Sequence, residues 1–285
     1  MAIGDISLTG AMRNTLVSLQ DTSKLMDRTQ ERLSTGKKVN SALDNPANFF
    51  AAQAHTSRAN ILDSRKDSMN EAIQTIKVAD KGVKGITTLV ENLRGILSQA
   101  RSYVGNAAAD ATKDAALDDL ETQYAEVISQ IDSLVTDSNY KGTNLISSAT
   151  ADALTVVFNE DNTSSLGLDA VDLTANAGLG LTAAPTFAST DAQSALDAFE
   201  TELNDALSTL RTSSAALSSN LSIIQTRIDF TTDMVNSLTE GANKLTIADT
   251  NEEGANMLML QTRQQLGTTA LSLASQAAQS VLRLF

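Results

Sequence analysis

The spacing of apolar residues constrains this chain of 285 residues more than any other feature. From Ile76 to Val104, apolar positions recur in unbroken steps of three and four over about four heptads. Such a repeat is typical of helices that pack as coiled coils. Further stripes run through residues 117–134 and 196–245, and neither Gly nor Pro interrupts residues 186–240. The last stretch predicts one helix of roughly 80 Å, at about 1.5 Å per residue.

Each stripe alone would expose a continuous apolar row, so we expect the helices to pack against one another in an elongated antiparallel arrangement. The residues predicted to pack in these seams are Ile76, Val83, Ile86, Val90, Leu93, Leu97, Leu120, Val127, Ile131, Leu221, Ile224, Ile228 and Val235.

Both ends of the chain carry weaker stripes. The N-terminal stripe has Ser23 and Gln30 at two seam positions, and the C-terminal helix is rich in Ala, Gln and Ser. Helices of this kind bury too little apolar surface alone to offset their ordering entropy. We therefore predict that both ends are disordered in a single chain and become ordered against other copies. The assembly residues are Met12, Leu16, Leu19, Met26, Leu33, Leu258, Leu266, Leu273, Val281 and Leu284.

The helical period breaks in two places. Residues 139–190 contain turn formers around short β-branched runs, which predict strands over 154–158 and 166–173 joined by a turn at 159–165. Residues 34–46 form a Gly- and Asn-containing loop. The fold class is therefore mainly α: a long antiparallel coiled-coil hairpin or rod with a small β-hairpin insert, its helical termini packed together.

Composition excludes several classes of function. Without cysteine the chain forms no disulfide, thiolate nucleophile or iron–sulfur cluster. A net charge of -13 argues against nucleic-acid binding, which needs Lys and Arg to neutralise phosphates. No apolar run approaches the roughly 18 residues of a membrane span, so no membrane insertion is expected. The N-terminus shows no cleavable secretory signal, so composition alone suggests the cytosol.

No cofactor, metal or catalytic site is expected. Gly178, Gly180 and Ala183 match a loose dinucleotide fingerprint, but Pro185 follows where the phosphate-binding helix should continue. His55 is the only histidine, so no histidine pair can hold a metal. The chain is therefore not expected to be an enzyme.

Charge is distributed unevenly. Residues 1–101 hold 14 basic and 10 acidic side chains, whereas residues 102–285 hold 7 basic and 24 acidic. An N-terminal arm lying against later helices would gain modest attraction from this asymmetry. The neighbouring carboxylates Asp118–Asp119 and Glu252–Glu253 are interpreted as solvated charges and helix-start charges, because adjacent helical residues point in different directions.

Two stretches resemble bacterial flagellin, the subunit of the flagellar filament. Residues 31–54, ERLSTGKKVNSALDNPANFFAAQA, are similar to the family pattern RLSSG-x-x-INSA-x-DDPAG, with Asn48 where Gly is usual. Residues 245–285, LTIADTNEEGANMLMLQTRQQLGTTALSLASQAAQSVLRLF, are similar to alphaproteobacterial flagellin tails. The resemblance covers roughly residues 1–150 and 190–285. The matching residues of the first stretch are Arg32, Leu33, Ser34, Gly36, Val39, Asn40, Ser41, Ala42, Asp44, Pro46 and Ala47.

The resemblance implies a domain organisation. Residues 1–45 would form the N-terminal inner helix and a connecting spoke, and residues 244–285 the C-terminal inner helix. Residues 46–138 and 191–243 would form the rod helices, with a short β-rich insert at 139–190. The spoke, where strain could bias the subunit between two filament states, would include Arg32, Gly36, Asn40, Asp44 and Pro46.

The resemblance also implies function and partners. The chain would self-assemble through its terminal and rod helices into the filament that drives motility. It would be exported by the flagellar type III apparatus without a cleaved signal, which places it outside the cell. A chaperone binding the C-terminal helix, the filament cap and the hook–filament junction proteins would be its partners.

One rod segment departs from the family. Flagellins that activate the vertebrate flagellin receptor resemble LQRVRELAVQ where this chain has VENLRGILSQ, so Glu91, Asn92, Gly95 and Ile96 differ. Poor receptor activation is the resulting hypothesis. Two alternative functions remain open at this stage: a flagellin-like hook–filament junction protein, and a surface ligand-binding protein built on a flagellin scaffold.

Overall fold

A computed structural model describes residues 10–104, 111–147, 154–182, 187 and 192–282. Within these residues it contains helices α1 (Gly10–Thr35), α2 (Pro46–Val104), α3 (Ala111–Asp137), α4 (Ala192–Thr246) and α5 (Thr250–Leu282) and strands β1 (Leu154–Val157) and β2 (Ser165–Leu168). The chain divides into two compact units, one made of residues 1–59 and 236–285, the other of residues 60–235. The mainly helical class with one small antiparallel sheet is confirmed.

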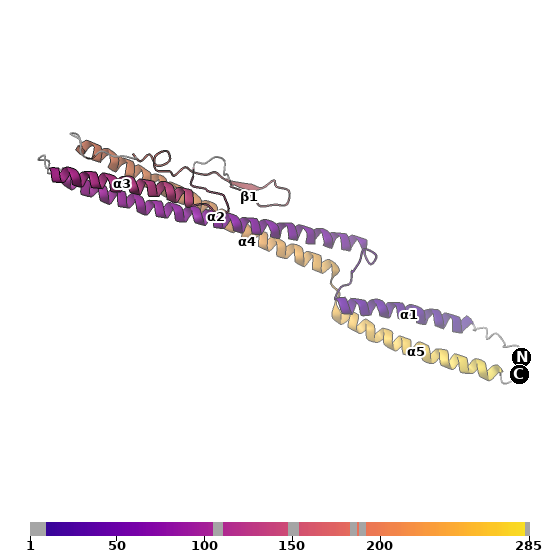
Figure 1. Ribbon diagram of the computed structural model, residues 1–285. Helices are drawn as coiled ribbons and strands as arrows, with labels where there is room; N and C mark the ends of the chain where they lie inside the picture. Colours follow the sequence, from indigo (N-terminus) through magenta and orange to yellow (C-terminus); the bar gives the residue numbers. More distant parts are fainter. Residues whose placement is uncertain (1–9, 105–110, 148–153, 183–186, 188–191, 283–285) are drawn as a thin grey trace. The chain divides into compact units, whose positions relative to one another are not determined.

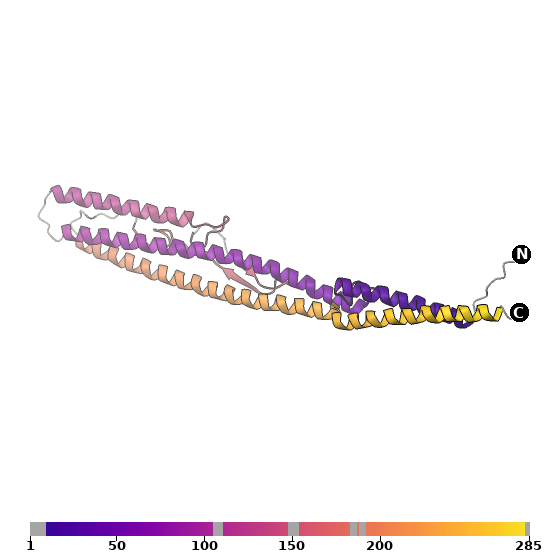
Figure 2. The same cartoon turned by 90° about the horizontal axis from the view of Figure 1, so that it is seen from below.

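The second unit is a helical bundle with a hairpin at its side. In both views, α3 runs alongside the parts of α2 and α4 that belong to this unit (Figures 1 and 2). The 55-residue α4 matches the long uninterrupted stretch expected from the sequence, although it ends at Thr246 rather than near residue 243. The periodicity therefore identified the long helices and their order.

The apolar stripes of α2, α3 and α4 form the core of this unit. Val127, Leu221 and Val235 are half-buried. The other predicted seam residues are buried: Ile76, Val83, Ile86, Val90, Leu93, Leu97, Leu120, Ile131, Ile224 and Ile228. Because these side chains fill the core of a single chain, their first role is to stabilise the subunit.

The insert contains a β-hairpin that is shorter than predicted. Leu154 pairs with Leu168 and Val156 with Leu166, and Asn162 in the turn adopts a φ of 56°. The expectation that the second strand reaches residue 173 is wrong. Beyond Leu168 the backbone changes partner: the amides of Val171 and Leu173 donate to the carbonyls of Leu145 and Ile146.

Helix carboxylates fasten the segment that returns from the hairpin. Glu202 accepts hydrogen bonds from the amide and hydroxyl of Thr182, at 3.0 and 3.1 Å. Asp132 accepts one from the Ala175 amide at 2.8 Å. The two amide bonds, from Thr182 and Ala175, satisfy backbone donors that a strand would otherwise pair. The return segment therefore lies across α3 and α4 without regular structure of its own.

The end of this segment covers an aromatic cluster. Phe187, whose amide donates to Glu121, lies with Tyr124 and Phe199, and the ring centroids are 6.1–6.3 Å apart. Tyr124 is fully buried, and burial raises the pKa of its phenol. The insert thus completes the core of the bundle rather than forming a separate domain.

Two glycines of α2 provide a matched test of this packing. A Cβ at Gly82 would lie 2.5 Å from Ser138 Oγ and 2.7 Å from Ile146 Cδ1, whereas one at Gly95 would meet nothing within 4 Å. Both changes to alanine gain helix propensity, but only Gly82→Ala overpacks the core. We expect Gly82→Ala to be less stable than Gly95→Ala by about 1–3 kcal/mol in urea unfolding. Equal stabilities would contradict this packing.

Candidate assembly surfaces

The first unit is built on the pair α1 and α5, which contact each other along their lengths. The buried seam contains Met12, Thr22 and Thr29 from α1, with Glu253 and Leu260 from α5. It is therefore more polar than the seams of the second unit, and it buries few large apolar side chains. The contact between two helices joined by such a seam contributes little free energy of stabilisation, because it buries little apolar surface.

A glycine of α5 lies directly beneath a leucine of α1. A Cβ on Gly267 of α5 would lie 2.7 Å from Cδ2 of Leu19 on α1. The absence of that Cβ lets the Leu19 side chain lie directly on the α5 backbone. This contact was not predicted, because the sequence pattern marks leucines and not the small residue beneath them.

The predicted apolar stripe of α5 faces away from α1. Leu258, Leu266 and Leu273 are 66%, 67% and 61% exposed, and Met259 beside them is 53% exposed. Steps of eight and seven residues keep the three leucines on one face of the helix. Leucines spaced in this way leave an apolar row without a partner in the described part of the chain.

The other predicted assembly residues divide between the two environments. On α1, Met12 is buried and Leu19 and Met26 are half-buried, whereas Leu16 and Leu33 are exposed. The side chain of Val281 and the whole of Leu284 lie outside the described residues. Both terminal segments are helical in the structure, and their disorder in a single chain stays a prediction.

The connector between α1 and α2 pairs with the connector between α4 and α5. Lys37 and Ile247 form an antiparallel bridge. The amide of Lys38 donates to the carbonyl of Thr246 at 2.7 Å, and the amide of Ala248 donates to the carbonyl of Gly36 at 3.0 Å. Gly36 adopts a φ of +67°, which glycine tolerates without steric cost. The two chain reversals are thus held together by backbone bonds.

A hydrogen-bonded turn follows in the same connector. One carboxylate oxygen of Asp44 accepts from the amides of Asn40 and Ser41, at 3.1 and 3.0 Å. The side chain of Asn40 also donates to Glu31. Asn45 then caps α2 by accepting from the Asn48 amide at 3.1 Å, and Pro46 is the first helical residue, where its missing N–H costs nothing.

Protonation of Asp44 tests this turn. Backbone hydrogen bonds from Ser41 and Asn40 lower the pKa of Asp44 below 3.8. A lowered folded-state pKa means that the carboxylate stabilises the turn above pH 3.8 and that this contribution is lost as the pH falls through the folded value. We expect the amide NMR shifts of Asn40 and Ser41 to change over that acidic range. In Asp44→Asn they should not titrate; titration there would contradict the assignment.

An ion pair joins α1 to α5 near the connectors. Arg32 Nη1 lies 3.0 Å from Glu253 Oε1, and Glu253 is only 6% exposed. The interpretation of Glu253 as a solvated charge is therefore wrong, because its position in the first turn of α5 directs it towards α1. Glu252, Asp118 and Asp119 are exposed, as expected.

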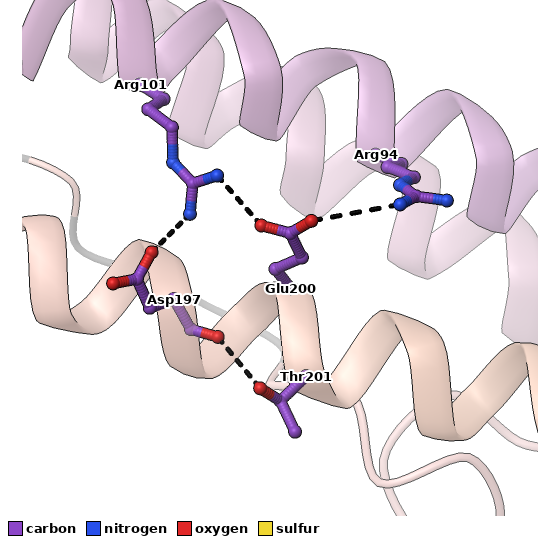
Figure 3. Close-up of polar contacts among 5 residues, drawn as sticks. All are labelled: Arg94, Arg101, Asp197, Glu200 and Thr201. Atoms are coloured by element: carbon purple, nitrogen blue, oxygen red, sulfur yellow. Dashed lines mark hydrogen bonds and ion pairs between the residues drawn. The ribbon is translucent and has the colours of Figure 1, made fainter.

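The second unit has a charge network between α2 and α4 (Figure 3). Arg101 donates to Asp197 and, at 2.8 Å, to Glu200, which also lies 3.8 Å from Arg94. These N-terminal cations meet C-terminal carboxylates, as the charge asymmetry suggested. All four side chains are at least a third exposed, so each pair contributes little to stability.

The receptor-region residues lie on either side of Arg94 in the sequence of α2. Glu91, Asn92 and Gly95 are exposed and Ile96 is half-buried. In the part of the chain that the structure describes, no three His, Asp or Glu side chains gather as metal ligands, and no helix is long and apolar enough to cross a membrane. The notable surfaces are therefore helix faces.

Comparison with known proteins identifies two family regions. The bacterial flagellin N-terminal helical region matches residues 6–151, and the bacterial flagellin C-terminal helical region matches residues 190–285. Flagellin FljO and flagellin FljN of Caulobacter vibrioides are 30% and 31% identical over 285 residues, covering 100% of both chains in each case. A flagellin of Brucella melitensis is 27% identical and covers 95% of each chain.

Proposed function

This chain belongs to the bacterial flagellin family and is a structural subunit of the flagellar filament, and from that premise we propose that its terminal helices carry the assembly. The observation that supports this most is the exposed row of Leu258, Leu266 and Leu273 on α5. Burying these leucines against other copies removes apolar surface from water, which the polar seam with α1 does not.

Assembly requires contacts that do not close on themselves. When one surface of a subunit binds a different surface of the next and the rotation between them does not close a ring, the contact repeats and generates an open helical polymer. We propose that such contacts use the α5 stripe, including Val281, together with Leu284 and with Met12, Leu16, Leu19, Met26 and Leu33 of α1. The buried stripes of α2, α3 and α4 keep the rod rigid, so that it can support these contacts between copies.

The domain roles follow the same division. Residues 1–45 and 244–285 serve as inner helices with the connecting spoke, residues 46–138 and 191–243 as the rod, and 139–190 as the insert. In the spoke, the ion pair comes from Arg32 and the left-handed turn from Gly36. The side-chain hydrogen bonds come from Asn40 and Asp44, and the next helix begins at Pro46. We propose that this connector, a short loop between helices, biases the subunit between two filament arrangements.

Partners and location form part of the proposal. The subunit is exported through the flagellar type III apparatus, is held by a chaperone at its C-terminal helix before export, and is added beneath a cap beyond the junction proteins. The mature polymer is extracellular. The exposed leucines of α5 favour a chaperone, because such a row is prone to premature association. Its role is structural and not catalytic.

A weak response of the vertebrate flagellin receptor is proposed from the rod surface. Glu91, Asn92 and Gly95 are exposed on α2, so their departures from the activating pattern alter a surface that a receptor could contact. A receptor reporter assay on monomers should give a lower response than an enteric flagellin. An equal response would contradict this part of the proposal.

Electron microscopy of purified protein after seeding tests the filament function. The intact chain should form long filaments, and a chain lacking roughly the first 50 and last 40 residues should remain soluble and monomeric. Filaments from the truncated chain would show that the terminal helices are not required. Absence of filaments from the intact chain under conditions that polymerise a Caulobacter flagellin would overturn the self-assembly proposal.

A further inference from the structure

The connector turn presents an apolar side chain almost completely to solvent. Leu43 is 95% exposed, whereas Leu266, the next most exposed large apolar side chain in the described residues, is 67% exposed. Surface turns ordinarily carry Gly, Asn, Asp or Ser. A leucine at this position contributes almost nothing to the folded subunit, because it buries almost no surface there.

The turn holds Leu43 in a fixed position. The amide of Leu43 donates to Ser41 Oγ at 3.3 Å, and the amide of Asp44 donates to the carbonyl of Ser41 at 3.2 Å. Upstream, the amide of Val39 donates to the carbonyl of Thr246 at 3.2 Å, and Val39 is buried. A turn ordered in this way loses little backbone conformational entropy when it binds a partner.

The exposed row of α5 offers a matching set of four positions, called here the recess. Leu266, Thr269, Ala270 and Leu273 follow the i, i+3, i+4, i+7 spacing of the four residues that surround a knob in a helix–helix interface, and all four are exposed. Thr269 and Ala270 are small, so they form the floor between two leucines. Because all four residues are exposed, this set is accessible to a second copy.

The knob and the recess of one chain cannot meet. Leu43 lies four residues beyond Val39, which is bonded next to the start of α5, so it can reach about 14 Å along an extended chain. Ala270 lies 20 residues after Thr250, about 30 Å along the helix. A contact between them joins two copies through different surfaces, and such a contact extends into an open polymer when the rotation between copies does not close a ring.

We propose that Leu43 of one copy inserts between Leu266 and Leu273 of a second copy, over Thr269 and Ala270. This contact rests on the proposed filament function and specifies one of its head-to-tail interfaces. It also explains why the turn is both tightly bonded and tipped with leucine. Its loss weakens assembly and leaves the fold of the subunit unchanged.

Engineered disulfides test the contact directly, because the native chain has no cysteine to interfere. Chains carrying Leu43→Cys and chains carrying Ala270→Cys are mixed, polymerised from seeds and oxidised, and cross-linked peptides are identified by mass spectrometry. A disulfide forms only where Cα atoms approach within about 7 Å. The matched control replaces Ala270→Cys by Thr268→Cys, an exposed position on another face of α5.

We expect the 43–270 link to exceed the 43–268 link by at least about tenfold in filaments and to be absent from monomers. Filaments that form without this excess would overturn the Leu43 contact and leave the filament function intact. Failure of the unmodified chain to polymerise would overturn the filament function itself.

A substitution supplies the second readout. Leu43→Ser should raise the critical concentration for seeded growth about tenfold, while its thermal midpoint equals that of the parent. Leu43→Met keeps an apolar knob and should polymerise like the parent. Equal critical concentrations for Leu43→Ser and Leu43→Met would contradict the contact.

Discussion

Replacing Leu258, Leu266 and Leu273 by glutamine abolishes seeded filament growth at micromolar concentrations. The three side chains are each about two-thirds exposed in the subunit, and burying that surface between copies contributes about 4 kcal/mol per subunit. Because 1.4 kcal/mol corresponds to a factor of ten, the critical concentration should rise roughly a thousandfold. Sedimentation of polymer after seeding measures it.

Glutamine is chosen because its helix propensity is close to that of leucine, so α5 itself is preserved. The control places the same residue on another exposed face, as Thr268→Gln together with Ser272→Gln. The control should polymerise like the parent. Normal growth of the triple leucine variant would mean that the exposed row of α5 has no part in assembly.

Replacing Ile131 by alanine destabilises the rod by about 2–5 kcal/mol, the range for large-to-small changes in a core. Ile131 is fully buried among the stripes of α2, α3 and α4, where bundle packing leaves a cavity that neighbours fill only partly. Urea unfolding followed by far-UV circular dichroism gives the difference. Ile223→Ala, at a site that is 41% exposed, should cost less than about 1 kcal/mol. Similar losses at both sites would contradict the assigned core.

The rod could be predicted from the sequence because its heptads are apolar and uninterrupted. From Ile76 to Leu97 each seam position is buried in the chain's own core, so period and burial coincide. The terminal helices behave differently. Periodicity identifies an apolar face but not its partner, and on α5 the more apolar face is directed away from α1. The row from Leu258 to Leu273 was therefore found, but its orientation was not.

Several of the contacts that the sequence did not predict are polar. The seam between α1 and α5 uses Thr22, Thr29 and Glu253, which a search for apolar spacing passes over. The return segment of the insert is held by hydrogen bonds to Asp132 and Glu202. In the sequence, these two residues look like ordinary surface charges. Such contacts depend on which segments meet in space, and no local pattern of residues encodes them.

Amide hydrogen exchange in monomer and filament tests most directly whether the terminal helices carry assembly. The account predicts fast exchange over residues 10–35 and 250–282 in the monomer and slow exchange in the filament, with residues 60–100 slow in both. Protection of the terminal helices in the monomer equal to that of the rod, or fast exchange that persists in the filament, would contradict it.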